Sequence, residues 1–384
     1  MGRHFLQIPG PTNVPDEVLH AISYPTIDHR GPTFQALGRR LLAKLGPVFG
    51  TVEPVVVYPA SGTVAWEAAL VNTLSPGDRV LFVETGHFAT LWQHMAGALG
   101  LRVDVVPGDW RHGVDEAAVL ERLQADTAHE IRAVCVVHNE TSTGVTSRIA
   151  DVRAAIDQAG HPALFLVDTI SSLGSLDYRH DEWEVDVTVA GSQKGLMLPP
   201  GLSFNAVSAK AREASRTATL PRSFWDWTPI LAANANGFWP YTPATNLLCG
   251  LDVALDMLYA EGLEAVFARH QRHAAATRAA VLEWGLELLC LDEREYSGSL
   301  TAVLMPEGYD ADELRRIILD RYDMSLGAGL TRLAGTVFRI GHLGSFNDLT
   351  LAGTLSGVQM GLRVLGVPVK GSGVDAALEL LQRP

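Results

Sequence analysis

Short apolar runs alternate with longer segments of helical periodicity from about residue 53 onward. The apolar runs predict strands at 54–58, 79–83, 101–106, 133–137, 163–167, 185–190 and 202–207. The segments between them predict helices, among them 64–74, 91–99, 115–124 and 149–159. Strands made almost entirely of Val, Leu, Ile and Ala are typical of a sheet that is covered on both faces. The alternation therefore predicts an α/β fold with a mostly parallel sheet.

The pattern changes near residue 262, where a long helix-forming segment begins. Residues 263–288 are rich in Ala, Arg and Glu, and later segments predict a strand at 299–305, a helix at 311–322 and a strand at 337–340. The first fifteen residues hold three prolines and two glycines, which predicts an extended arm. Because 384 residues exceed the usual size of one core, we expect an arm at 1–15, a large domain at 16–262 and a smaller α+β domain at 263–384.

Charge and composition exclude several classes of partner. The net charge of −13 opposes binding to nucleic acid or to an anionic membrane. No apolar run approaches the roughly 18 residues that span a bilayer, and the N-terminal residues lack the apolar core of a signal peptide. Cys135, Cys249 and Cys290 favour neither a disulfide framework nor a zinc site, so we expect a cytoplasmic protein. His270 and His273 lie among charged residues on a predicted helix, and we expect them to be solvated rather than metal ligands.

Two polar features follow predicted strands, at the edge where open α/β sheets bind ligands. Ser61, Gly62 and Thr63 follow PVVVY and precede a helix, so their N–H groups would suit a phosphate. Hydroxyl residues in this position also commonly act only as helix caps. Asp168 ends the run ALFLVD, where it would either face a pyridinium nitrogen or cap the next turn.

The third feature is Lys194, in the turn GSQKG between EVDVTVA and the apolar LMLPPGL. Burial lowers the pKa of a lysine, as Schiff-base chemistry requires; a solvated surface lysine is the alternative. A phosphate turn, a strand-end acid and a strand-end lysine follow one another along the chain. Together they predict a site for pyridoxal 5′-phosphate (PLP), with Lys194 carrying the cofactor as a Schiff base.

The motifs GSQKGLMLPPG, VDTISSLGS and HNETSTGV resemble those of the class V, fold-type I, PLP-dependent aminotransferases. The resemblance continues through IPGPTNVP, YPASGT, ETGHF, LPRSFWDW, PYTPAT and FRIGHLG, and it is strongest to the serine–glyoxylate and the alanine– or aspartate–glyoxylate group. It implies a fold-type I α/β fold with PLP as cofactor and no metal. It also implies transfer of an amino group from an L-amino acid to glyoxylate, giving glycine and a 2-oxo acid, with serine favoured as donor over alanine or aspartate.

The resemblance implies a role for each matching residue. Lys194 corresponds to the Schiff-base lysine, which also moves the α-proton of the substrate, and Asp168 to the partner of the pyridine nitrogen. The other implied cofactor contacts are Ser61, Gly62, Thr63 and Gln193 around the phosphate, Phe88 stacked on the ring, Thr141 near the phenolic oxygen, and Ile170 on the opposite ring face.

Substrate and subunit contacts are implied in the same way. Arg339 corresponds to an arginine that binds the α-carboxylate through two parallel hydrogen bonds, with a surface salt bridge as the alternative. Gly10 matches an arm segment that approaches the substrate closely. Thr242 matches a threonine that reaches the phosphate of a neighbouring subunit, which implies a homodimer with shared active sites. A tyrosine of relatives is replaced here by Trp239, so whether Trp239 or Tyr241 contacts the phosphate stays open.

Two other functions remain as alternatives. A class V PLP lyase similar to a cysteine desulfurase needs a nucleophilic cysteine on a mobile loop. The three cysteines fall instead in a predicted buried strand, at the start of a helix and after a long helix. A non-catalytic α/β binding protein is the second alternative, and the joint presence of Lys194, Asp168 and Arg339 counts against it.

Overall fold

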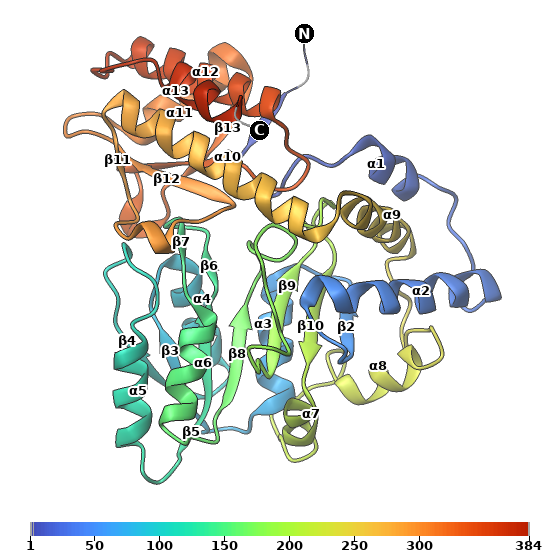
Figure 1. Cartoon of the computed structure of the whole chain (residues 1–384). Coiled ribbons are helices and arrows are strands. Elements are labelled where there is room, and N and C mark those ends of the chain that lie inside the picture. The colour runs from blue at the N-terminus through green and yellow to red at the C-terminus, as the bar shows by residue number, and fades with distance from the viewer. Residues whose placement is uncertain (1, 3, 383–384) are drawn as a thin grey trace.

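The computed structural model describes residue 2 and residues 4–382. Its larger sheet has the strand order β2-β10-β9-β8-β5-β3-β4. The strands are β2 Val55–Tyr58, β3 Arg79–Val83, β4 Arg102–Val106, β5 Ile131–Val137, β8 Leu164–Asp168, β9 Val187–Gly191 and β10 Ser203–Val207. β10 runs antiparallel to both of its neighbours, β2 and β9, and every other pair of adjacent strands in this sheet is parallel. The predicted α/β fold with a mostly parallel sheet is confirmed (Figure 1).

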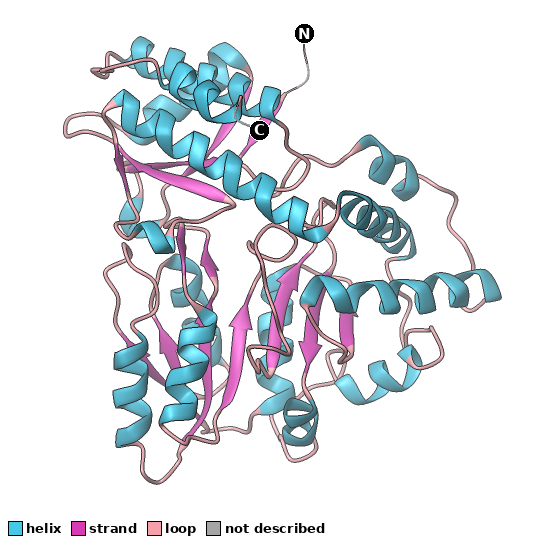
Figure 2. Ribbon diagram, in the orientation of Figure 1, coloured by secondary structure: helices cyan, strands magenta, loops and turns pink. Residues whose placement is uncertain are grey.

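Helices cover both faces of this sheet, as Figure 2 shows. Side chains alternate between two cores along each strand, so that Val55 and Val57 enter one core while Val56 and Tyr58 enter the other. The first core is covered by α2 Pro32–Phe49, α5 Glu116–Ala125, α6 Ile149–Gln158 and α9 Thr245–Glu261, with α1 Asp16–Ile22 packed on α9. The second is covered by α3 Gly62–Thr73, α4 His87–Ala98, α7 Ala209–Ser215 and α8 Trp227–Asn234. Burial on both faces explains the uninterrupted apolar runs.

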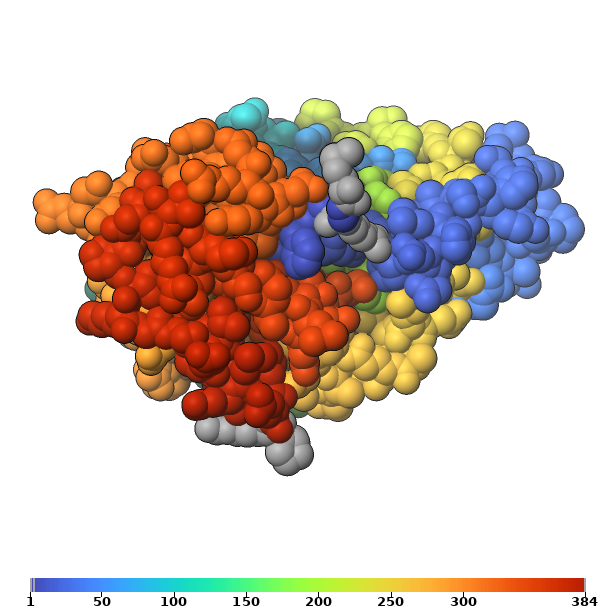
Figure 3. Space-filling view, turned by 90° about the horizontal axis from the view of Figure 1, so that it is seen from above, coloured from blue at the N-terminus to red at the C-terminus, as the bar shows by residue number. Residues whose placement is uncertain are grey.

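A five-stranded sheet lies beyond the carboxyl ends of the parallel strands, with the order β1-β13-β14-β12-β11 (Figure 1). Its strands are β1 Phe5–Gln7, β11 Glu287–Leu288, β12 Leu300–Leu304, β13 Met324–Ala328 and β14 Val337–Gly341. Its own core includes α10 Leu263–Trp284, α11 Ala311–Tyr322, α12 Asp348–Leu365 and α13 Gly373–Leu381. β1 pairs in parallel with β13, so the N-terminal arm supplies an edge strand to the C-terminal sheet. Figure 3 shows this arm lying against the C-terminal residues.

Four smaller elements complete the described residues. β6 Asn139–Glu140 and β7 Val145–Thr146 form a hairpin directly after β5. Short 3₁₀ helices occur at Glu293–Glu295 and Thr331–Leu333. Within the described part of the chain, no helix combines the length and the apolar character that crossing a membrane requires.

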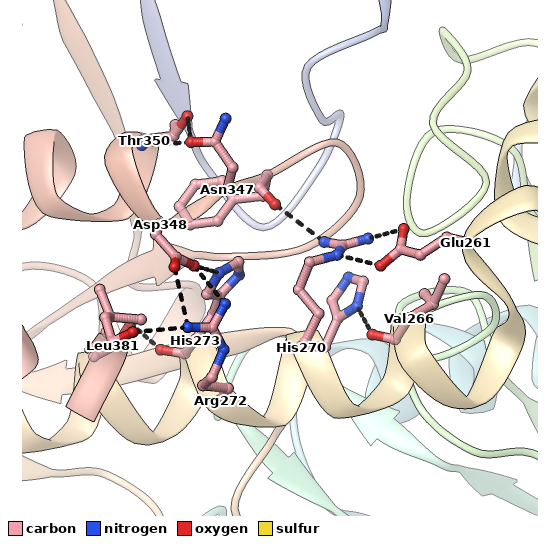
Figure 4. Close-up of polar contacts among 12 residues, drawn as sticks. Glu261, Val266, His270, Arg272, His273, Asn347, Asp348, Thr350 and Leu381 are labelled. Atoms are coloured by element: carbon pink, nitrogen blue, oxygen red, sulfur yellow. Dashed lines mark hydrogen bonds and ion pairs between the residues drawn. The ribbon is translucent and has the colours of Figure 1, made fainter. Parts of the chain in front are cut away.

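Two histidines on α10 differ from expectation, because both His270 and His273 are fully buried. His270 Nδ1 lies 2.7 Å from the Val266 carbonyl, and its Nε2 accepts the Gly344 N–H at 3.1 Å. His273 Nε2 lies 2.8 Å from the Asp348 carboxylate (Figure 4). Burial lowers the pKa of His270 to about 3, so this ring is neutral. The charged neighbours in sequence did not imply solvation, because the two histidines face the segment after β14 instead of water.

Candidate active site

A cavity of about 240 Å³ lies at the carboxyl edge of the seven-stranded sheet. Every predicted site residue except Arg339 and Thr242 lines it, namely Gly10, Ser61, Gly62, Thr63, Phe88, Thr141, Asp168, Ile170, Gln193 and Lys194. These residues come from the arm, the start of α3, the start of α4, the β6–β7 hairpin and the segments after β8 and β9. A larger hollow of about 810 Å³, between the arm, α9 and the start of α12, contains none of them.

Lys194 follows β9 and is only 7% exposed. Its Nζ donates a hydrogen bond to the carbonyl of Pro9, in the arm. Burial lowers the pKa of Lys194 to about 7, and the positive charge of Arg339 lowers it further. The alternative of a solvated surface lysine is therefore wrong.

Asp168 ends β8 and is also buried. One carboxylate oxygen accepts the Ile170 N–H at 2.6 Å, and the other accepts the Trp66 indole N–H at 3.0 Å. Burial raises the pKa of Asp168 to about 7, against the effect of these two hydrogen bonds. Turn capping thus accounts for one oxygen only. The contact with Trp66 was not predicted, although Trp66 lies one helical turn beyond Gly62 and Thr63 and so shares their side of α3.

The polar groups of the cavity fit PLP. Ser61 is the N-cap residue of α3, yet its side chain makes no capping hydrogen bond, which leaves the hydroxyl and the helix N-terminus for a phosphate. Gln193 Oε1 is a buried acceptor without a hydrogen-bond partner among the described residues, and such a group is costly unless a ligand donor satisfies it, whereas a phosphate would take its hydrogen bond from the Nε2 amide group of the same side chain. Lys194 supplies an amine and Asp168 a carboxylate. The α3 N-terminus, the amine and the carboxylate match the phosphate, the aldehyde and the pyridine nitrogen of that cofactor, respectively.

The arm covers Lys194 of its own chain. Gly10 has a φ of 96°, and a Cβ atom there would lie 2.3 Å from Lys194 Cδ. The Thr12 N–H donates to the Gln193 carbonyl at 3.1 Å, and the Thr12 hydroxyl donates to the Lys194 carbonyl at 3.2 Å. Only glycine combines this left-handed backbone with so close an approach.

Arg339 lies in the middle of β14 and is 7% exposed. Its Nε donates to the Ala328 carbonyl at 2.8 Å, and its Nη1 donates to the Thr141 carbonyl at 2.7 Å. Among the residues that the structure describes, no carboxylate lies within ion-pair distance of it, so the surface salt bridge is wrong. Burial lowers the pKa of Arg339 to about 10. Although Arg339 does not line the cavity, it hydrogen-bonds Thr141, which does.

Thr242 is not brought to this cavity. It lies on the exposed loop after α8, beside Trp239 and Tyr241. The Trp239 indole N–H donates to the Val57 carbonyl at 3.2 Å, so this side chain is engaged within its own chain. Tyr241 is 43% exposed and stacks on Phe224 with ring centroids 4.8 Å apart.

Comparison with known proteins finds a family and close relatives that match nearly the whole chain. Residues 4–331 match the family described as aminotransferase class-V. The chain is 47% identical to serine–glyoxylate aminotransferase of Arabidopsis thaliana, over 99% of this chain and 96% of the relative. It is 48% identical to L-aspartate–glyoxylate aminotransferase of Paracoccus denitrificans, over 97% of this chain and 94% of the relative.

Solved structures agree with this result. Pyridoxamine–pyruvate aminotransferase of Mesorhizobium loti superposes with a TM-score of 0.90 at 29% identity, covering 98% of this chain and 96% of that one. Ureidoglycine–glyoxylate aminotransferase of Bacillus subtilis, at 24% identity, supports the fold with a TM-score of 0.92 over 100% and 99% of the two chains. The chain therefore belongs to the class V aminotransferases and is a PLP-dependent enzyme of fold type I.

Proposed function

We propose that this enzyme transfers the amino group of an L-amino acid to glyoxylate, with serine as the favoured donor and alanine and aspartate as other donors. Relatives of 47–48% identity that carry serine–glyoxylate and aspartate–glyoxylate names support this reaction. The observation that carries the proposal is the buried Lys194, held between the arm and the cavity that contains Asp168. The products are glycine and the 2-oxo acid of the donor.

Some residues of the site are assigned to the cofactor and others to the substrate. PLP, when bound, supplies an electron-withdrawing ring that stabilises negative charge at the α-carbon of the substrate. Asp168 would hold the ring nitrogen through its carboxylate, and Lys194 would take and return the α-proton at Nζ. The α-carboxylate binds to Arg339, whose guanidinium is already oriented by two carbonyl oxygens. The other residues that would hold the cofactor are Ser61, Gly62, Thr63 and Gln193 at the phosphate and Phe88, Thr141 and Ile170 around the ring.

The lowered pKa of Lys194 supports its role as a base. A pKa of about 7 means that the neutral amine predominates above roughly neutral pH. An ordinary lysine, with a pKa near 10.4, would still be protonated there. A proton acceptor whose pKa lies near the working pH is the most effective one.

We propose that the active enzyme is a homodimer in which Thr242 reaches the phosphate bound by the neighbouring subunit. Two exposed features support this proposal: the loop that carries Thr242, and the stacked rings of Phe224 and Tyr241. Together they leave polar and aromatic side chains uncovered. Since Trp239 is hydrogen-bonded within its own chain, Tyr241 is the better candidate for a second phosphate contact.

The alternative as a cysteine desulfurase has less support. Cys135 is buried in β5, Cys249 lies in α9, and Cys290 lies in the loop after β11 but is buried, so none is an exposed nucleophile on a loop. The three free cysteines suit our proposal of a cytoplasmic enzyme. Nothing in the cavity favours a binding protein that has lost its chemistry.

A panel of amino donors tests the proposal. Purified holoenzyme is incubated with serine, alanine or aspartate, each with glyoxylate, and glycine formation is measured. We expect the highest kcat/KM with serine, and no glycine from the Lys194→Ala variant. Failure to form glycine from any of the three donors, in a protein that carries bound PLP, would overturn the proposed function.

A further inference from the structure

Glu140 is a fully buried carboxylate next to the cavity, and the proposed reaction does not use it. It ends β6, directly before Thr141. Oε1 accepts hydrogen bonds from the Ser142 hydroxyl at 2.6 Å, the Ser142 N–H at 3.0 Å and the Phe88 N–H at 3.3 Å. Oε2 accepts the Ala89 N–H at 3.1 Å. One side chain therefore holds two segments that lie about fifty residues apart along the chain.

These contacts determine where α4 begins. Its N-cap residue, Gly86, has no side chain to satisfy the free N–H groups of the first turn. Glu140 binds two of them, and the Ser142 hydroxyl accepts the His87 N–H at 2.9 Å. A Cβ atom at position 86 would lie 2.4 Å from Glu140 Cγ, so the absence of a side chain lets the carboxylate reach the helix. The position of the Phe88 ring depends on this arrangement.

The same carboxylate fixes the turn that receives Arg339. Thr141 lies between Glu140 and Ser142, and both of these neighbours are part of the hydrogen-bonded group. The Thr141 carbonyl accepts Nη1 of Arg339 at 2.7 Å. A displacement of Glu140 would therefore move the acceptor that orients the guanidinium.

We propose that Glu140 is a positioning residue for both halves of the site: its carboxylate sets the start of α4, which carries Phe88, together with the turn that carries Thr141 and orients Arg339. The inference rests on the proposed function for the roles of Phe88 and Arg339. It adds a residue that touches neither cofactor nor substrate.

The carboxylate of Glu140 also influences the pKa values of neighbouring side chains. Burial is the main influence on Lys194 and Arg339 and lowers the pKa of each, while the nearby Glu140 carboxylate raises both values. It also raises the pKa of Asp168, on which burial again acts more strongly. Glu140 thus favours the protonated form of the lysine and the charged form of the arginine. An amide in its place would remove this effect and would also present an N–H₂ group to a backbone donor.

The test compares wild-type and Glu140→Gln holoenzymes without amino donor. The visible absorption of the bound cofactor is titrated with pH, and we expect its midpoint to fall by about one unit, because a neighbouring negative charge is lost. Binding of glycolate, a carboxylate with no amino or keto group, is followed by the same absorption band. We expect its Kd to rise on the order of tenfold, as for the loss of one charge-assisted hydrogen bond.

Matched variants separate positioning from general stability. Glu295 is another buried carboxylate that accepts a backbone N–H, that of Gly113 at 2.8 Å, but it lies outside the cavity. Glu295→Gln should leave the midpoint and the glycolate Kd unchanged. Glu140→Asp keeps the charge and should restore most of the midpoint while leaving glycolate binding weak, because the shorter side chain cannot bridge both segments.

Ser142→Ala provides a test should Glu140→Gln fail to fold. It removes the hydroxyl that links Oε1 to the His87 N–H but keeps the charge. We expect weaker glycolate binding, altered visible circular dichroism and an unchanged midpoint. Wild-type midpoint and glycolate affinity in Glu140→Gln, or unaltered binding and dichroism in Ser142→Ala, would overturn the inference. These two results would contradict the role of Glu140 without affecting glycine formation by the wild-type enzyme. Failure of the proposed function, in contrast, would appear as absent glycine formation in the wild-type enzyme itself.

Discussion

The two sheets contribute to one active site in different ways. The seven-stranded sheet places its functional groups at or just after strand ends, since Asp168 is the last residue of β8 and Lys194 follows β9. The five-stranded sheet supplies Arg339 from the middle of a strand and, through β1, the arm that lies on Lys194. Strand-end groups lie where parallel sheets bind ligands, so their order along the chain already predicts a site. The role of an arginine in the middle of a strand can be inferred only from the groups that other segments place beside it.

The largest effect is expected from removing Lys194, the amine that the seven-stranded sheet contributes. Lys194→Ala should abolish turnover, since a positioned general base alone contributes about 10²- to 10⁴-fold. The variant should still fold and hold PLP through the phosphate contacts. Borohydride reduction of the wild type followed by peptide mass mapping should label Lys194. A pyridoxyl adduct on any other lysine would contradict the assignment.

Asp168→Asn tests the second strand-end group. The amide cannot stabilise a protonated ring nitrogen, and breaking such a buried charge pair costs about 3–5 kcal/mol. We expect this loss chiefly in kcat, with a smaller change in PLP affinity, as measured by steady-state kinetics and cofactor titration. A nearly normal kcat would mean that Asp168 only caps the turn at Ile170.

Arg339→Lys tests the contribution of the five-stranded sheet. A point charge replaces a two-pronged contact, so kcat/KM should fall by about 2–4 kcal/mol for donor and for glyoxylate alike. Both substrates carry the carboxylate that this arginine is proposed to bind. A defect confined to one of them would show that the two substrates are held differently.

Gly10→Ala tests the arm and should have the smallest effect. A left-handed backbone costs a non-glycine residue roughly 1–2 kcal/mol, and here the new Cβ would also overlap Lys194. Gly308 is a matched control, because its φ is 87° and a Cβ there meets nothing within 4 Å. Both variants carry the backbone cost, so Gly10→Ala should lose at least as much stability as Gly308→Ala in thermal unfolding, but only Gly10→Ala should lose activity. Equal activities would show that the arm does not control the lysine.

The apolar pattern of the chain predicted the seven-stranded sheet well, because short continuous apolar runs are typical of strands that are buried on both faces. It did not predict α2, whose Gly38, Gly46 and Pro47 disfavour a helix. Packing overrides that local preference, since Phe34 and Leu41 are buried in the core. It also did not predict β1, which has only three residues and pairs with β13 alone, or β13, which lies between β1 and β14.

The candidate site likewise contains residues that the sequence motifs predicted and residues that they did not. Ten residues expected from motifs do line one cavity. Trp66, Thr12 and Glu140 were missed because each acts through a contact made from another segment. Local pattern indicates which residues carry chemistry, whereas the residues that hold them in place depend on tertiary structure.

The pairing of β1 with β13 has a consequence for how the protein is made. Next to this pair, His4 and Asp323 form a hydrogen bond although they lie 319 positions apart in the sequence. Closing so long a loop is entropically costly and slow. The arm is synthesised more than three hundred residues before the strand on which it docks. A nascent chain that has not reached β13 has no edge on which to seat the arm, so the cover over Lys194 is among the last parts of the active site to form.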